Sequence, residues 1–147
     1  MSVLAYLTHP LGDRDALDEF GGFARQNNIG NAMQWLKFMV MATQWSVVCP
    51  WFPYLVALDE TFFGRRAFID NLEVLTRSDV LVLVGGRNSP HMRQEARMAQ
   101  SRDISGRAIP VLDLLTLGAA PPWHRLDQTR LDIERQAKEL GVQDGYA

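Results

Sequence analysis

The chain has 147 residues, with 15 basic and 17 acidic side chains and a formal net charge of −2 at pH 7. This length suits one domain with a substantial core, and the charge provides no basic footprint for a nucleic-acid polymer. A single cysteine, Cys49, excludes an internal disulfide, and no apolar stretch is long enough to span a membrane or arranged like a signal peptide. We therefore expect a cytoplasmic protein without a membrane partner, and we interpret Cys49 as a buried structural thiol rather than a nucleophile.

The first strand is predicted over residues 3–7, and a loop containing His9, Pro10, Leu11 and Gly12 follows it. Pro10 ends the strand and Gly12 permits a turn. In α/β proteins the carboxyl ends of strands carry the ligand contacts, so this loop is a candidate binding segment. The alternative for His9 is a loop histidine without a role.

Residues 13–27 are polar and contain Gly21-Gly22, which predicts a loop that could act as a lid. Apolar residues then recur at helical spacing over residues 28–43, with Asn28 as the N-cap. Trp35 and Phe38 make this helix unusually apolar. They belong either to the core or to a subunit interface, and the apolar surplus indicates a homo-oligomer, dimeric or larger.

A second strand is predicted over residues 45–49, followed by a proline-rich aromatic loop that contains Trp51. An aromatic side chain at a strand end either stacks on a base or sugar or seals the edge of the sheet. A helix beginning at residue 65 or 66 and ending at 77 comes next, and Asp70 and Asn71 lie on it.

The apolar run 80–84 is typical of a strand buried on both faces, and Gly85 and Gly86 allow a sharp turn after it. Ser89 suits the N-cap of the next helix and Pro90 its first position. Exposed N–H groups at such a turn and helix start suit a phosphate or a carboxylate.

A fourth strand over residues 108–112 and a charged helix over 124–140 complete the chain. The thin apolar stripe of that helix consists of Leu126, Leu131 (or Thr129), Ile133, Ala137 and Leu140. The alternation of elements predicts an α/β fold with a doubly wound parallel sheet of four to five strands, Rossmann-like or flavodoxin-like, with strands one and three at its centre. We expect residues 1–118 to form this domain. Residues 119–147 form a helical extension packed on the same domain or on a partner subunit.

The chemistry that the sequence supports centres on Glu95, which lies one and a half turns into the helix that Ser89 begins. The chain has no Walker motif, GxGxxG, GxSxG or metal-ligand spacing, so we expect no cofactor and no metal. Carboxylate chemistry remains. A glutamate can attack a sugar anomeric carbon while a second acid protonates the leaving group.

Five segments, taken together, resemble the nucleoside 2-deoxyribosyltransferase superfamily. They are YLTHPLG, NIGNAMQWL, CPWFPYL, DNLEVLTRSD and LVGGRNSPHMRQEARMA, and the match runs from residue 3 to about residue 115. The closest branch is the small bacterial and phage deoxyribosyltransferase-like group, which includes nucleoside 5′-monophosphate N-glycosidases. The resemblance implies that Glu95 is the nucleophile, and that Ser89 with the Gly85–Gly86 backbone holds a phosphate or 5′-hydroxyl.

The chain departs from the family pattern at two positions. Counted from Asp79, the acid that assists the leaving group falls on Asn71, which cannot transfer a proton, with Asp70 one residue before it. His91 stands where the family has a glycine. The candidate catalytic residues are Glu95, Asp70 and Asn71. The candidate substrate-binding residues are His9, Pro10, Leu11, Gly12, Trp51, Gly85, Gly86, Arg87, Ser89, His91 and Met92.

Two functions are consistent with this site. The first is cleavage or transfer of the N-glycosidic bond of a nucleoside or nucleoside 5′-monophosphate. The second is a catalytically silent nucleotide-binding or sensing module on the same fold. Asn71 favours the silent module, whereas the pair formed by Ser89 and Glu95 favours the enzyme, and the enzyme is the preferred prediction.

Overall fold

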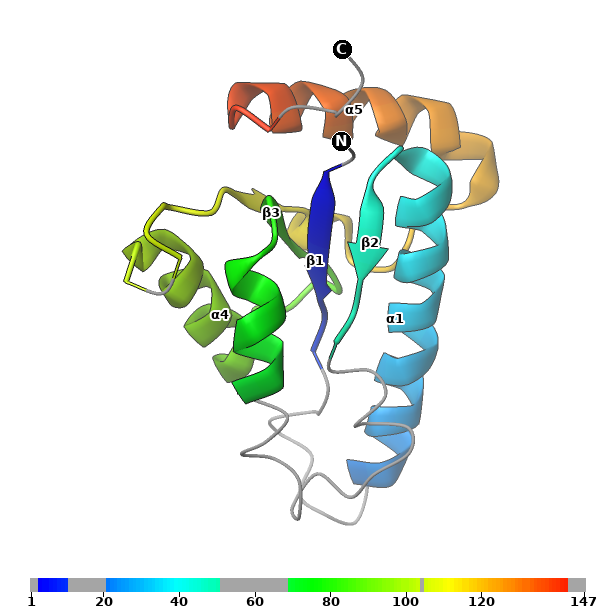
Figure 1. The fold of residues 1–147 in the computed structure, drawn as a ribbon. Helices are drawn as coiled ribbons and strands as arrows, with labels where there is room; N and C mark the ends of the chain where they lie inside the picture. The colour runs from blue at the N-terminus through cyan, green and yellow to red at the C-terminus, as the bar shows by residue number, and fades with distance from the viewer. Residues whose placement is uncertain (1–2, 11–20, 51–68, 104, 143–147) are drawn as a thin grey trace.

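A parallel sheet forms the centre of the computed structural model, which describes residues 3–10, 21–50, 69–103 and 105–142. Within these residues the strands are β1 (Leu4–Thr8), β2 (Ser46–Val48), β3 (Val80–Leu83) and β4 (Val111–Asp113), all parallel, in the order β2-β1-β3-β4 (Figure 1). The predicted α/β fold is confirmed, and strands β1 and β3 are central as expected. The chain leaves β1 toward β2 on one side and returns to β3 on the other, so the topological switch point lies between β1 and β3.

The two central strands end level with each other. Thr8 at the end of β1 pairs with Leu83 at the end of β3, and every residue of β3 is buried. A continuous Val-Leu run of this kind needs cover on both faces of the sheet. Side chains near these two strand ends therefore converge on one crevice.

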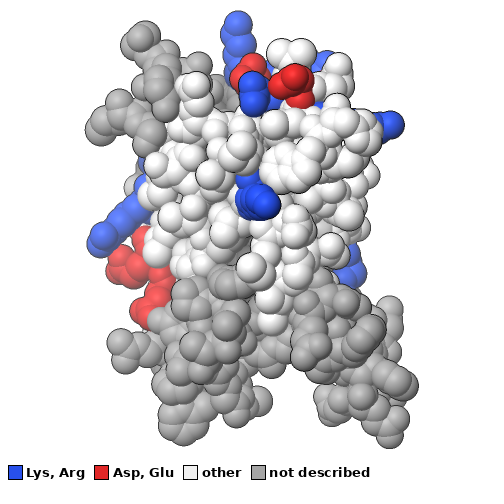
Figure 2. Space-filling model, turned by 90° about the vertical axis from the view of Figure 1, so that its right-hand side faces the viewer, with Lys and Arg blue, Asp and Glu red and all other residues white. Residues whose placement is uncertain are grey.

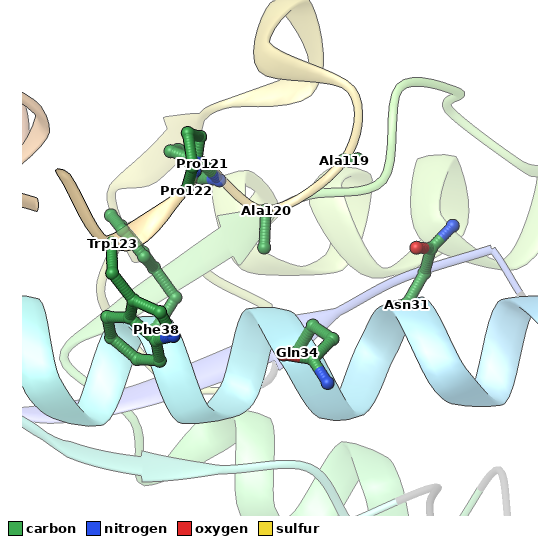
Figure 3. Close-up of a pocket in the computed structure, with 8 residues that line it drawn as sticks. All are labelled: Asn31, Gln34, Phe38, Ala119, Ala120, Pro121, Pro122 and Trp123. Carbon is green, nitrogen blue, oxygen red and sulfur yellow. The ribbon is translucent and has the colours of Figure 1, made fainter. Parts of the chain in front are cut away.

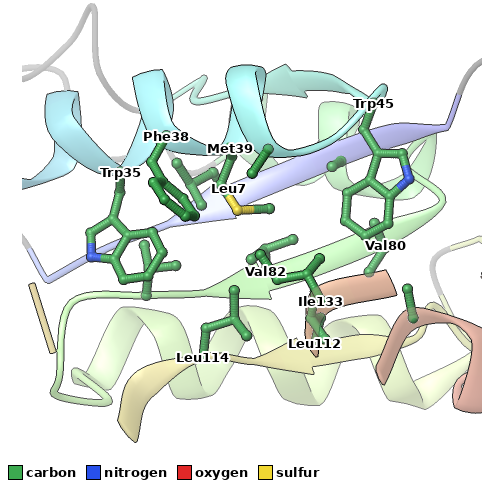
Figure 4. Packing of buried hydrophobic residues seen from close by; sticks show 14 of the residues in the cluster. Leu7, Trp35, Phe38, Met39, Trp45, Val80, Val82, Leu112, Leu114 and Ile133 are labelled. Atoms are coloured by element: carbon green, nitrogen blue, oxygen red, sulfur yellow. The ribbon is translucent and has the colours of Figure 1, made fainter. Parts of the chain in front are cut away.

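Helices cover both faces of the sheet. The helix α1 (Gly21–Ala42) and the C-terminal helix α5 (Leu126–Glu139) bury Trp35, Phe38 and Ile133 against one face (Figure 4). The helix α4 (Pro90–Ser101) and the helical residues 69–76 cover the other face. Two short 3-10 helices, η1 (Leu115–Leu117) and η2 (Trp123–Arg125), connect β4 to α5.

The beginning of α1 differs from the sequence prediction. The helix starts at Gly21 and not at Asn28, so the predicted loop is wrong over residues 21–27. A glycine within a helix lowers its stability by about 1 kcal/mol relative to alanine. Once the later turns are packed against the core, however, adding residues other than proline to the existing helix requires little free energy. Trp35 and Phe38 supply that packing. Both are buried in the core, with their rings edge to face at 5.8 Å, so the core alternative is the correct one for them.

Two later elements also differ in their bounds. Strand β4 is Val111–Asp113 and not residues 108–112, because Pro110 has no N–H to donate and contributes only its carbonyl, which accepts from Leu81 N at 2.9 Å. Helix α5 is Leu126–Glu139 rather than 124–140, and it packs on α1 of the same chain. Its buried face contains Thr129, Ile133 and Ala137, so the stripe prediction is right there with Thr129 in place of Leu131. Leu131 is 60% exposed and Leu140 is 42% exposed, so the prediction is wrong for these two residues.

The surface formed by α1 carries few charged side chains (Figure 2). Among the side chains of α1 that the structure describes, Met33, Val40 and Met41 are large, apolar and exposed. The expected homo-oligomer would cover this surface, and it stays a prediction. Within the described part of the chain, no helix is both long enough and apolar enough to cross a bilayer.

Candidate active site

Glu95 lies on the buried side of α4, above the carboxyl ends of β1 and β3. The turn after β3 leads into Ser89, the N-cap residue in extended conformation, and Pro90 is the first helical residue. Glu95 is only 6% exposed. The Thr8 hydroxyl donates a hydrogen bond to Glu95 Oε1 at 2.8 Å, and so it connects the end of β1 to the helix. The predicted meeting of a strand end with the Glu95 helix is therefore present.

Tyr6 and Thr8 reach Glu95 because alternate residues of a strand face the same side of the sheet, and α4 packs on that side. Burial, followed by the nearby negative charge of Glu95, raises the pKa of Tyr6 far above its ordinary value. The phenol therefore keeps its proton and can act as a donor. It lies close enough to the carboxyl to influence its pKa, but it makes no hydrogen bond of normal distance and angle within the described residues.

Burial raises the pKa of Glu95 to about 7, and the hydroxyl groups of Tyr6 and Thr8 act in the opposite direction. The carboxyl thus exchanges its proton near neutral pH, as groups that act in proton transfer do. Burial, with a contribution from the Glu95 charge, also raises the pKa of the Cys49 thiol to about 12. Cys49 stays protonated and packs against both core clusters, as a structural thiol does.

His9 is held in one orientation by its neighbours. Its Nδ1 donates to the carbonyl of Pro10 at 2.7 Å, which leaves Nε2 as an acceptor, and its side chain is buried. Gly85 has φ +102°, and a Cβ there would lie 2.6 Å from His9 Cδ2. Glycine is therefore required both for the turn and for the close approach of the imidazole. Burial lowers the pKa of His9, which keeps the ring neutral.

His91 connects the helix start to the carboxyl. Its Nδ1 lies 2.9 Å from Ser89 Oγ and its Nε2 lies 3.9 Å from Glu95 Oε1. Ser89 is the N-cap by position, but its hydroxyl contacts the imidazole and makes no cap hydrogen bond. The sequence reading of Ser89 as a good N-cap therefore holds for its position and not for its hydrogen bond.

His91 and Glu95 do not form an ion pair in this structure. Burial lowers the pKa of His91 to about 4; the His9 carbonyl opposes this, and the charges of His9 and Arg87 add to it. Glu95 loses its proton only near pH 7. Because the imidazole is already neutral where the carboxylate forms, no pH gives a large population with both groups charged.

Four buried polar atoms in this crevice lack a hydrogen-bond partner among the described residues. They are Tyr6 Oη, His9 Nε2, His91 Nε2 and Glu95 Oε2. A buried group without a partner costs about 1–3 kcal/mol, so a cluster of them needs an explanation. Their position at the switch point between β1 and β3 is where open α/β sheets bind ligands. The arrangement is that of a polar site that a ligand would complete.

Asp70 and Asn71 lie in the helical residues 69–76, and both are half-buried. Asn71 Oδ1 is another buried atom without a partner. The side chains that act on the pKa of Glu95 are Tyr6 and Thr8, and Asp70 is not among them. His91 Nε2 lies 3.9 Å from Glu95 Oε1, so this imidazole is beside the nucleophile candidate.

The other predicted binding residues fall into three groups. Met92 is fully buried in the core cluster under α4, whereas Gly86 is exposed and Arg87 is half-buried in the turn. Pro10 is buried beside Gly85. Leu11, Gly12 and Trp51 lie outside the described residues.

Sequence reasoning missed Tyr6 and Thr8 as residues of the site. The available signal was their spacing: two polar-tipped side chains on the same face of an otherwise apolar strand, directly before His9. A polar group on a buried face needs a partner, and that requirement points to a polar site on the neighbouring element.

A separate hollow of about 200 Å³ lies between α1 and the segment before α5 (Figure 3). It is lined by Asn31, Gln34, Phe38, Ala119, Ala120, Pro121, Pro122 and Trp123. None of these side chains titrates, so the hollow offers no acid–base chemistry. Among the described residues, no group of three His, Cys, Asp or Glu side chains could hold a metal ion.

Comparison with protein-family models, with curated proteins and with solved structures finds no match to this chain.

Proposed function

We propose that this protein cleaves or transfers the N-glycosidic bond of a nucleoside or nucleoside 5′-monophosphate, with Glu95 as the nucleophile. One observation carries the proposal. A buried carboxyl group is held at Oε1 by Thr8 and leaves Oε2 without a partner. A carboxylate in this state can form a bond to an anomeric carbon without first breaking a hydrogen bond at the attacking oxygen.

The surrounding groups support this chemistry. Thr8 orients the carboxyl group, and the Tyr6 phenol keeps its proton and offers a donor to the oxygens of the sugar or to the carboxylate. Attack requires the ionised form of Glu95, whose pKa is about 7. We therefore expect kcat/KM to rise with pH through about 7.

The turn before α4 is the proposed site for the far end of the sugar. Gly85 and Gly86 both have positive φ and form the turn, and Arg87 follows them directly. A helix start and a neighbouring guanidinium suit a 5′-hydroxyl or a 5′-phosphate. This placement agrees with the role that the family resemblance implies for Ser89 and the two glycines.

A silent nucleotide-binding module is the second candidate function. Asn71 stands at the position of the expected acid, and an amide cannot transfer a proton to a leaving base. In such a module the same unpartnered atoms would bind the nucleotide without cleaving it.

The direct test is release of free base from a panel of nucleosides and nucleoside 5′-monophosphates, measured by chromatography. Glu95→Gln keeps an acceptor for Thr8 but removes the nucleophile, and we expect release to fall by at least about 10³-fold. The matched control is Glu134→Gln, the same change at an exposed position of α5, which we expect to leave release unchanged.

Persistent base release by Glu95→Gln would reject the catalytic assignment. Absence of release by the unaltered protein, together with saturable nucleotide binding by calorimetry, would favour the silent module. A covalent glycosyl adduct on the peptide containing Glu95, detected by mass spectrometry, would support the nucleophile directly.

A further inference from the structure

We propose that His91 is the proton-transfer residue of this site, moving a proton between solvent, the leaving base and the attacking water. The inference rests on the proposed function. It assigns to His91 the role that the family pattern gives to an acid at the position of Asn71.

The geometry of His91 fits a relay. Its Nδ1 is held 2.9 Å from Ser89 Oγ, which fixes the ring, and its Nε2 lies 3.9 Å from Glu95 Oε1 with no partner of its own. The side chain is 35% exposed, whereas that of Glu95 is 7% exposed. The imidazole is therefore more exposed than the carboxyl group beside it, and it can meet both solvent and a leaving base.

Four groups among the described residues face His91. They are Ser89 and Glu95 on α4, His9 after β1, and Arg87 in the turn after β3. The positive charge of Arg87 and the burial of the ring disfavour a lasting imidazolium. A neutral imidazole with a free Nε2 can accept a proton and pass it on quickly, rather than store it.

Bonds and protons are conserved over one turnover. In the first step the C1′–N bond breaks as the C1′–O bond to the ionised Glu95 forms, and a proton that His91 takes from solvent passes to the nitrogen of the leaving base. In the second step a water oxygen bonds to C1′ as the C1′–O bond to Glu95 breaks. The water proton passes through His91 to solvent, and the released Glu95 carboxylate restores the starting state. In transfer, the N–H of an acceptor base takes the place of water.

The test compares two leaving groups. A nucleoside base needs a proton as it leaves, whereas the 4-nitrophenolate of a 4-nitrophenyl 2-deoxyriboside does not. For His91→Gln we expect single-turnover base release from the nucleoside to fall by about 10²–10⁴-fold, with nitrophenolate release changed less than about threefold. We expect Glu95→Gln to lose both, and His124→Gln, which changes an exposed histidine, to lose neither.

Two further variants keep the test independent of folding. His91→Asn retains a polar group near the position of Nδ1 for contact with Ser89, and it should show the same split between the two substrates. His91→Ala leaves space for free imidazole, and we expect added imidazole to restore nucleoside cleavage in this variant only. Circular dichroism and thermal melting establish that each variant is folded.

The outcomes separate the two proposals. Equal activity of His91→Gln and the unaltered protein on both substrates would overturn the relay while the proposed function stands. Equal loss on both substrates in folded variants, without rescue by imidazole, would show a structural role and would also overturn it. If the unaltered protein cleaves neither substrate and forms no adduct on Glu95, the proposed function fails and the relay falls with it.

Discussion

At the end of the sheet where the strands begin, Asp79 Oδ2 accepts a hydrogen bond from Leu4 N at 2.8 Å, and Arg107 donates to the Ser78 carbonyl at 2.7 Å. At the end where the strands finish, Glu95 and its neighbours retain buried atoms without partners. Asp79 and Glu95 both belong to the family-like pattern in the sequence. The Asp79 side chain is half exposed and has partners in Leu4 N and Arg107. The Glu95 side chain is buried, and only one of its two oxygens has a hydrogen-bond partner among the described residues. The difference indicates that the amino end of the sheet stabilises the fold, while the carboxyl end retains unsatisfied groups for a ligand.

The largest expected effect tests the close packing at the carboxyl end. Gly85→Ala places a Cβ 2.6 Å from the His9 ring at φ +102°, so we expect a loss of about 4 kcal/mol in the free energy of unfolding. Gly106→Ala is the matched control, because Gly106 also has positive φ (+76°) but no atom near its Cβ position. Strain alone there should cost about 1 kcal/mol. Equal losses in urea denaturation would show that the contact with His9 is unimportant.

The second prediction concerns the cost of ionising Glu95. Its pKa is about 7 in the folded protein and 4.5 in the reference state, so the folded protein binds the proton more tightly. The tighter proton binding of Glu95 adds about 3 kcal/mol to the free energy of unfolding below about pH 4.5. This contribution is lost as the pH rises from there through about 7. Relative to the unaltered protein, Glu95→Gln should gain that amount between pH 4.5 and pH 8. Parallel pH curves for the two proteins would show that the carboxyl is not buried as described.

The smallest effect is expected at the amino end. Asp79→Ala removes the acceptor for Leu4 N and the contact with Arg107 at 3.9 Å, both near the surface. We expect a loss of about 1 kcal/mol in thermal melting, with base release unchanged. Asp79→Asn retains an acceptor and should recover most of that loss. Loss of activity without loss of stability would contradict a purely structural role for Asp79.

Much of the fold could be predicted from the residues alone. The run from Val80 to Val84 has no polar interruption, which is typical of a fully covered strand, and the alternation of strands with helices implied a parallel sheet. The start of α1 could not be predicted. Two glycines and a polar segment have low helix propensity, but packing of the later turns against the sheet outweighs that preference.

Only part of the site could be predicted, because only some of its residues are close together in the chain. Glu95 and Ser89 are on one helix start, and local spacing is enough to place them together. Tyr6 and Thr8 became parts of the site only through long-range packing, because Thr8 and Glu95 are 87 residues apart in the chain. His91, four residues before Glu95 on the same helix, was already a candidate. The spacing of a helix predicted that Ser89 could cap it, but it did not predict that the hydroxyl would turn to His91 instead.

The sequence by itself determined the order of strands and helices, the turn at Gly85–Gly86 and the position of a glutamate just inside a helix, because each depends on residues close together in the chain. The tertiary structure alone decided that Glu95 is buried, that Thr8 holds one of its oxygens, and that the Tyr6 hydroxyl lies near the carboxyl group. Burial and the partners of a polar group depend on which distant segments pack together. Those two quantities determine the pKa of a carboxyl group, and with it the chemistry that the group can perform.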